Sequence, residues 1–139
     1  MPTALSSSLQ SALHLLHRAG QRADGLFTRY VGNVLTPRQF AILQAVGEAN
    51  GLSQTDIMAA TGIDRSSTAA LVGRLVRAAR RRTRRDARLY AVRLTPEGRQ
   101  VLSQASPAAR ATEESLLGPL ALADRATFLK ALALIAAVA

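Results

Sequence analysis

Apolar side chains near the start of the chain recur every three or four positions: Leu5, Leu9, Leu13, Leu16, Ala19, Ala23 and Phe27. That spacing places them in one stripe along a helix. We therefore predict a helix over about 5–30, ending before Gly32 and Asn33. The same spacing favours a helix of the mature fold over a transit peptide, although no acid precedes Asp24.

The stretch LTPRQFAILQAV predicts a second helix. Thr36 suits the N-cap, Pro37 suits the first helical position, and Gln39 completes a capping box with Thr36. The positions expected to form the buried face and then the end of this helix are Phe40, Leu43, Val46 and Gly47.

Two shorter helices are predicted next, joined by a turn that contains Gly62. Ser53 is expected to cap the first, which ends near residue 61, and Asp64 to cap the second, which continues to about Arg77. On the second helix apolar residues share one face, and arginines and small residues lie around the other. This pattern is that of a helix-turn-helix, whose second helix enters the major groove of DNA.

A strand is expected over LYAVRLT, because Tyr90, Val92 and Leu94 alternate with smaller or charged residues. An arginine-rich loop beside a strand, directly after a helix-turn-helix, is typical of the wing of a winged helix. Thr95 and Pro96 then open a further helix, which Pro107 is expected to kink or break, and the rest of the chain reads as helical.

The predicted fold is therefore mainly α, with one domain over residues 1–139. A winged helix-turn-helix lobe occupies about 36–98, with a small β-wing, and dimerisation helices occupy about 5–32 and 99–139. Those outer helices carry more Leu, Ile and Ala than a small winged helix can bury alone. A homodimer is the simplest account, and two-fold dimers are the commonest oligomers.

The charge of the chain points to a polyanionic partner. The net charge is +9, and every basic residue except Lys130 is an arginine. Eight of these arginines lie between Arg74 and Tyr90, together with a single acid, Asp86. Arginine binds phosphate and the guanine edge through two parallel hydrogen bonds, so nucleic acid is favoured over a membrane surface.

Catalytic and metal chemistry find no support in the sequence. There is no glycine-rich phosphate loop, no H-E-x-x-H motif and no cysteine, so we expect neither an enzyme nor a cofactor. His14 and His17 have a spacing that can bind metal, but no acid lies within six residues of them, and no metal site is expected. The longest apolar run, ALALIAAVA, is about half as long as a membrane span, so no membrane partner is expected.

Three segments together resemble the MarR family, the multiple-antibiotic-resistance regulators: LTPRQFAILQAV, LSQTDIMAATGIDRSSTAALVGRL and DARLYAVRLTPEGRQVL. The resemblance covers about 36–102 and combines L-T-x-x-Q, D-R-S-S, D-x-R and L-T-x-x-G motifs. It implies a cytoplasmic, homodimeric winged-helix repressor that binds a pseudo-palindromic operator in duplex DNA. It also implies release of the DNA when a small aromatic acid or phenolic compound binds.

Two features depart from the family pattern. The place where relatives have the first strand of the wing is AARRRTR, residues 78–84, which has poor strand propensity. It predicts a wing that is short, mobile or incompletely represented by this sequence. Positions often held by Thr and Arg in the recognition helix are Ala69 and Ala70, which can contact a thymine methyl group but donate no hydrogen bond. Base readout is then expected to depend more on Arg65, Ser66 and Ser67.

The expected DNA contacts come from the helix-turn-helix and from the arginine-rich stretch. Arg88, in the D-x-R motif, is expected to enter the minor groove, and Asp86 to orient it. Ser53 is expected mainly to cap its helix, a role compatible with a phosphate contact. The full set of predicted contacts is Ser53, Arg65, Ser66, Ser67, Ala69, Ala70, Arg74, Arg77, Arg84, Arg85 and Arg88.

An effector pocket near the first two helices is a further expectation, with His14, His17, Arg18, Tyr30 and Phe40 as candidate lining residues. Two other functions stay open. One is an architectural basic protein that coats DNA without an effector or much sequence preference. The other is a winged helix that binds protein and never touches DNA.

Overall fold

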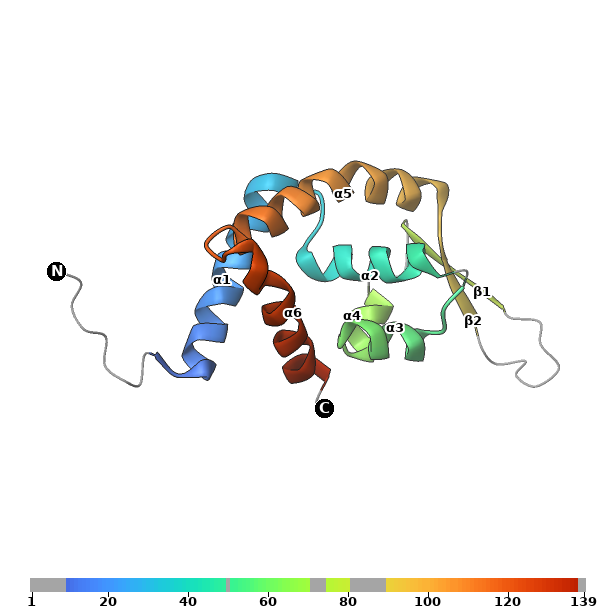
Figure 1. Ribbon diagram of the computed structural model, residues 1–139. Coiled ribbons are helices and arrows are strands. Elements are labelled where there is room, and N and C mark those ends of the chain that lie inside the picture. Colours follow the sequence, from blue (N-terminus) through green and yellow to red (C-terminus); the bar gives the residue numbers. More distant parts are fainter. Residues whose placement is uncertain (1–9, 50, 71–74, 81–89, 138–139) are drawn as a thin grey trace. The chain divides into compact units, whose positions relative to one another are not determined.

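The computed structural model describes residues 10–49, 51–70, 75–80 and 90–137 (Figure 1). The chain divides into two compact units, one made of Val31–Ala108 and the other of Met1–Tyr30 with Ala109–Ala139. The described elements are mainly helical, with one small sheet, as the sequence predicts. In chain order they are α1 (Ala12–Val31), α2 (Pro37–Glu48), α3 (Gln54–Thr61), α4 (Arg65–Ala70), β1 (Val76–Arg80), β2 (Tyr90–Leu94), α5 (Pro96–Leu117) and α6 (Leu122–Ala137).

Helix α1 begins later than the apolar spacing suggests. Gln10 lies in a 3₁₀ turn and Ser11 in a bend, so the α-helix starts at Ala12. The backbone N–H of His14 donates to the Ser11 hydroxyl at 3.3 Å, which gives the first turn a hydrogen-bond acceptor. The part of the predicted helix at 5–9 lies outside the described residues.

The capping box at the start of α2 is confirmed. The Gln39 N–H donates to Thr36 Oγ1 at 3.1 Å, and the Thr36 N–H donates to Gln39 Oε1 at 3.0 Å. The predicted end at Gly47 is wrong, because α2 continues through Glu48. The chain leaves the helix in an extended conformation at Ala49 (φ −114°, ψ 146°), and such an exit requires no left-handed glycine.

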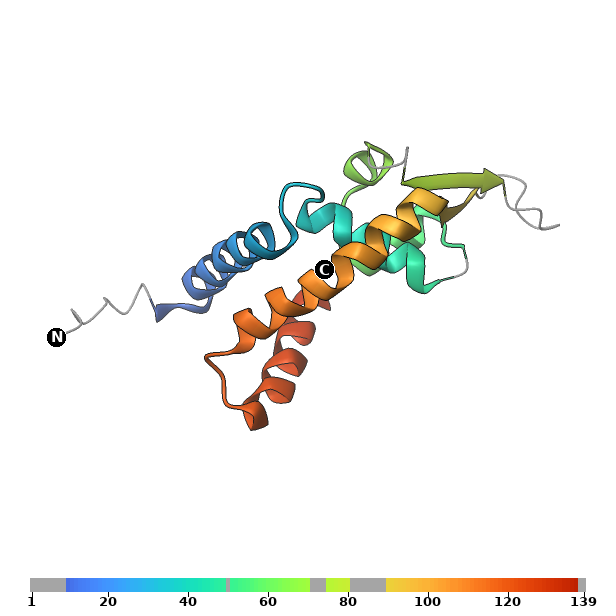
Figure 2. The same cartoon turned by 90° about the horizontal axis from the view of Figure 1, so that it is seen from above.

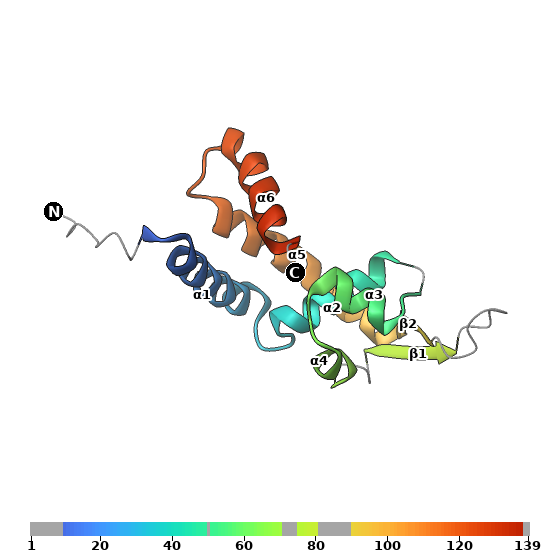
Figure 3. The same cartoon turned by 90° about the horizontal axis from the view of Figure 1, so that it is seen from below.

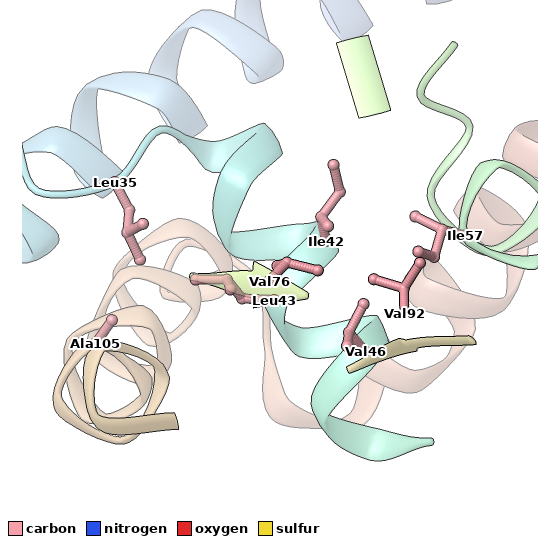
Figure 4. Packing of buried hydrophobic residues seen from close by; sticks show 8 residues of the cluster. All are labelled: Leu35, Ile42, Leu43, Val46, Ile57, Val76, Val92 and Ala105. Atoms are coloured by element: carbon pink, nitrogen blue, oxygen red, sulfur yellow. The ribbon is translucent and has the colours of Figure 1, made fainter. Parts of the chain in front are cut away.

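The core of the Val31–Ala108 unit is formed where α2 meets α3, the sheet and the first half of α5 (Figure 4). Ile57 and Val92 are completely buried, and Leu43 is 2% exposed. Phe40 is half-buried and packs against this core, as its place on the predicted buried face requires. The buried members of the cluster are Leu35, Ile42, Leu43, Val46, Ile57, Val76, Val92 and Ala105.

Strands β1 and β2 form an antiparallel pair in which Val76 lies opposite Leu94 and Arg77 lies opposite Arg93. Residue Leu52, just before α3, extends the sheet by one bridge to Val92. The Val92 N–H donates to the Leu52 carbonyl at 2.6 Å, and the Leu52 N–H donates back at 3.3 Å. The helix-turn-helix is thereby joined directly to the wing through main-chain hydrogen bonds.

The boundary between recognition helix and wing differs from the prediction. Within the described residues α4 covers Arg65–Ala70 and β1 already begins at Val76, so a helix extending to Arg77 is wrong. The first strand begins two residues before the expected place at 78–84: β1 covers Val76–Arg80, and residues 81–84 lie outside the described ones. Val76 is β-branched and only 2% exposed, and its burial opposite Leu94 explains why the strand starts there.

The link from the wing into α5 depends on a close approach between two backbone segments. The Thr95 N–H donates to the Leu75 carbonyl at 3.1 Å, and Thr95 Oγ1 accepts from the Gly98 N–H at 3.0 Å. A Cβ added at Gly98 would overlap the Leu75 carbonyl oxygen. The L-T-x-x-G motif therefore has a structural explanation: threonine caps α5, and only glycine fits against Leu75. Figure 2 shows the start of α5 beside the two strands.

Pro107 does not end α5, which continues as one helix to Leu117. A proline inside a helix removes one main-chain donor, here the one that would bind the carbonyl of residue 103. The Ser106 hydroxyl donates to the Leu102 carbonyl at 2.7 Å in the same turn. The prediction of a break at this position is therefore wrong.

In the unit made of the terminal segments, α1 is joined to the end of α5 by polar contacts. The Tyr30 hydroxyl and Ser115 Oγ are 2.8 Å apart, and Arg22 donates to the Ser115 carbonyl at 3.5 Å. Arg125 of α6 forms an ion pair with Glu114 at 3.1 Å. No residue of the described part of α6 is buried. A search of the described helices finds none with the length and apolarity needed to cross a membrane.

Candidate nucleic-acid interface

Helices α3 and α4 are each fixed at their ends by short polar side chains. The Asp56 N–H donates to Ser53 Oγ at 3.0 Å, and the Ser53 N–H donates to Asp56 Oδ2 at 3.1 Å. Gly62 then adopts a left-handed conformation (φ 70°) and donates to the Met58 carbonyl at 2.8 Å. These bonds end α3 and turn the chain toward α4, and α3 packs against both α2 and α4 (Figure 3).

Asp64 caps α4, because its Oδ2 accepts from the Ser67 N–H at 3.0 Å. Hydrogen bonds from the Ser67 side chain and backbone lower the pKa of Asp64 below its usual value. The carboxylate is therefore ionised at neutral pH and holds the first turn of the helix.

The two sides of α4 differ in exposure. Thr68 is completely buried, and its hydroxyl donates to the Ile63 carbonyl at 3.4 Å. Arg65 and Ser66 are exposed, and Ser67 is half-buried. The buried side fixes the orientation of the helix in the unit, and the exposed side presents a guanidinium and a hydroxyl group outward. Both can read base edges or bind phosphate.

The sheet next to α4 carries arginines in register across its two strands. Arg77 and Arg93 lie directly opposite each other, and Arg93 is exposed. The pairing places Arg77 on the wing, and its predicted place on the recognition helix is wrong.

Apart from Arg77 on β1, the predicted DNA contacts fall into three groups. Arg65, Ser66, Ser67, Ala69 and Ala70 all lie on α4, as expected for a recognition helix. Ser53 is 8% exposed and is engaged in the capping box, so its predicted capping role is confirmed, while a phosphate contact stays a prediction. The remaining wing and recognition-helix arginines lie outside the described residues, as does Asp86: Arg74, Arg84, Arg85 and Arg88.

The effector pocket expected near the first two helices stays a prediction. His14 is half-buried on α1, and His17 and Arg18 are exposed on the same helix. Tyr30 is 41% exposed and bound to Ser115, in the same unit. Phe40 belongs to the other unit, where it packs against the core.

Two exposed arginines near the interface were missing from the predicted contacts. Arg38 is exposed in the first turn of α2, and its charge contributes to the lowered pKa of Asp64. Arg93 is exposed on β2 and could have been found from the alternation of that strand, in which it occupies a polar position. Both add positive charge beside the helix-turn-helix.

A helix-turn-helix made of α3 and α4, followed by the antiparallel pair of β1 and β2, defines the winged helix-turn-helix class of DNA-binding regulators. A family model described as MarR family matches residues 35–88, which include α2, α3, α4 and β1. A search of curated proteins gave no match.

Solved structures match the chain over nearly its whole length. A probable transcriptional regulator from Pseudomonas aeruginosa is 31% identical, with 90% of this chain and 96% of that chain covered and a TM-score of 0.80. BpsR from Bordetella bronchiseptica, whose DNA binding is regulated by 6-hydroxynicotinic acid, is 28% identical, with coverage of 94% and 96% and a TM-score of 0.84. The transcriptional repressor CouR, bound to a 23-mer DNA duplex, is 29% identical, with coverage of 98% and 99% and a TM-score of 0.82.

The chain belongs to the MarR family of winged-helix transcriptional regulators. The resemblance identified from the sequence motifs is thus confirmed, together with the fold class. The family and the similar structures are transcriptional regulators and not enzymes.

Proposed function

We propose that the chain is a homodimeric repressor that binds a pseudo-palindromic operator and releases it when a small aromatic acid or phenolic compound binds. The observation that carries the DNA-binding part is the two-sided character of α4. Its inner side is fixed by the buried Thr68, and its outer side presents Arg65 and Ser66. CouR, a repressor solved on a DNA duplex, supports the same mode of binding by similarity.

The dimer is supported by apolar side chains of the terminal unit that the single chain leaves uncovered. Apart from Asp124, Arg125, Thr127 and Lys130, helix α6 consists of apolar residues, and its Leu134 and Ile135 are 72% and 58% exposed. On α1, Leu13 is 84% exposed. Exposed apolar side chains that cluster on a surface commonly mark an interface with a partner, and a second copy of the chain would bury these.

A test of the dimer introduces a negative charge on α6 by the substitution Leu134→Glu. We expect it to convert the dimer to monomer in light scattering after gel filtration, because a carboxylate would be buried in an apolar contact. Thr127→Glu, at an exposed polar position of the same helix, introduces the same charge and should leave the dimer intact. A wild-type chain that is monomeric at micromolar concentration would contradict the proposal.

The main test of function is a comparison of two duplexes at about 150 mM salt, where non-specific binding is weakened. The promoter of the gene itself should be preferred over a random duplex by about 10³-fold or more, as specific regulators show. Equal affinities would favour the architectural protein instead.

The wing is tested by replacing Arg84, Arg85 and Arg88 with alanine. Each lost phosphate contact should reduce the slope of log affinity against log salt by about one. A control with the same change in net charge replaces Arg18, Arg29 and Arg110, which are exposed in the other unit. DNA binding that survives the wing replacement unchanged would favour the winged helix that binds protein.

The ligand-responsive part rests on BpsR, whose DNA binding is regulated by 6-hydroxynicotinic acid. A ligand changes DNA affinity only when it binds the free and DNA-bound forms with different affinity. Small aromatic acids that bind the folded protein should raise its melting temperature, and the same compounds should then weaken operator binding. A compound that raises the melting temperature and leaves operator affinity unchanged would count against release.

A further inference from the structure

A cleft of about 430 Å³ opens in the Val31–Ala108 unit, on the side of α2 that faces α5. Its walls are the last turn of α2, the end of β2 and the first half of α5. The volume lies within the range of small-molecule sites, roughly 300–1,000 Å³. Its lining includes Val46, Leu94, Leu102, Arg93, Arg99 and Ser103.

The apolar part of the cleft is shaped by Gly47. A Cβ at this position would lie 2.7 Å from Leu102 Cδ2 and 3.3 Å from Leu94 Cδ1. Glycine inside a helix costs stability relative to alanine, and Gly47 does not have a positive φ that would require it. Its absent side chain instead lets the two leucines lie against the backbone of α2, where they form an apolar floor.

The polar part of the cleft is cationic. Arg93 comes from β2 and Arg99 from the first turns of α5, both side chains are exposed, and no Asp or Glu is among the lining residues. A guanidinium carries five N–H donors in a planar fork, so an arginine that already has one partner can still bind a carboxylate. The neighbouring Ser103 adds an exposed hydroxyl group.

We propose that this cleft binds a small organic carboxylate with an apolar body. The carboxylate would bind Arg93 and Arg99, and the body would lie on Val46, Leu94 and Leu102. A DNA phosphate would use the arginines but would leave the apolar floor without a partner, so the combination favours the amphipathic acid. The site differs from the pocket expected near α1, because all its residues belong to the Val31–Ala108 unit.

An occupant of this cleft would contact β2, the strand whose Arg93 and Leu94 pair with β1. Whether occupancy changes operator affinity rests on the repressor function proposed above. Binding of the acid itself does not, because it requires neither DNA nor a second copy of the chain.

The test is calorimetric titration of the full chain, without DNA, with benzoate, 1-naphthoate and octanoate, each compared with its neutral amide. At least one acid should bind about tenfold more tightly than its amide, since a charge-assisted hydrogen bond is lost with the charge. Arg99→Gln should lower the affinity for that acid by about tenfold or more. Arg110→Gln, an exposed position on the same helix outside the cleft, should not.

Ser103→Trp would fill the cleft without altering its charge and should abolish binding, with folding checked by a circular dichroism melt. The proposal is overturned if none of the three acids binds at millimolar concentration. It is also overturned if each acid binds no more tightly than its amide, or if Arg99→Gln and Arg110→Gln bind the acid with the same affinity. If the wild type binds no acid and Arg99→Gln loses affinity for DNA, Arg99 would instead be a phosphate contact. If the chain binds the acid but does not bind DNA, the proposed repressor function is contradicted and the proposed carboxylate site is supported.

Discussion

Replacing Gly98 by alanine tests how the wing is joined to α5. In an open helix the change from glycine to alanine stabilises by up to about 1 kcal/mol. At Gly98 the added methyl group would overlap the carbonyl oxygen of Leu75 and would lie 3.0 Å from the carbonyl carbon and 3.3 Å from the Cα. These are backbone atoms, so the strain can be relieved only by moving α5 or the segment that leads into β1.

The expected loss can be estimated from its parts. Overpacking of a close contact costs about 1–3 kcal/mol. Displacing the Leu75 carbonyl also weakens its hydrogen bond from the Thr95 N–H, 3.1 Å long, which contributes about 0.5–1.5 kcal/mol. Against these losses stands the small gain in helix propensity. We therefore expect Gly98→Ala to lower the free energy of unfolding by about 1–3 kcal/mol.

The assay is urea denaturation at one fixed protein concentration, because the stability of a dimer depends on concentration. Gly25→Ala is the matched control: Gly25 is helical, and a Cβ there would have no atom within 4 Å. It should leave the midpoint unchanged or raise it. A Gly98→Ala midpoint at or above that of the wild type would refute the close approach of Leu75 to α5.

Three further predictions concern single side chains. Ile57→Ala should cost about 2–5 kcal/mol in the same denaturation assay, because Ile57 is completely buried, and a loss below 1 kcal/mol would contradict the packing. Ser53→Ala should lower stability by about 1 kcal/mol through loss of the α3 cap, and an unchanged midpoint would contradict the capping box. Hydrogen bonds from Ser67 lower the pKa of Asp64 in the folded protein. Its contribution to folding stability is therefore fully present above the pKa of the unfolded state and is lost as the pH falls through the pKa of the folded state. In thermal melts from pH 7 down to about 3, the melting temperature of Asp64→Asn should fall less with acid than that of the wild type. Identical pH profiles for the wild type and the variant would contradict the cap.

The features predicted correctly from the sequence are local. Thr36 with Gln39 and Asp64 with Ser67 each act across three residues, so their chemistry can be read from adjacent letters. The same holds for Gly62, whose left-handed turn ends α3. Each of these caps is satisfied within one turn of helix, and no distant segment is needed to decide it.

The features that were missed depend on distant partners. Val76 continues a helical pattern of apolar residues, and only its pairing with Leu94 and its burial select a strand. Likewise, Arg93 and Arg99 come together with the last turn of α2 to form one cleft. No motif joins those segments, because their contact is produced by the packing of α5 and β2 on α2. Sequence spacing therefore could not indicate the cleft.

The motifs that identify the family are mostly structural, and this narrows where sequence-specific DNA recognition can lie. In D-R-S-S, Asp64 and Ser67 form the cap of α4, which leaves Arg65 and Ser66 as the exposed pair. The L-T-x-x-G motif is explained by the cap and close approach at Gly98, and contacts with DNA are not needed to account for it. The cap fixes the backbone of the first turn of α4. If α4 is the recognition helix proposed above, a bidentate contact of Arg65 with a base edge would discriminate one base pair by about 1–3 kcal/mol. Operator preference should therefore change with substitutions at Arg65 and Ser66, whereas substitutions at Asp64 should weaken binding to all sequences alike.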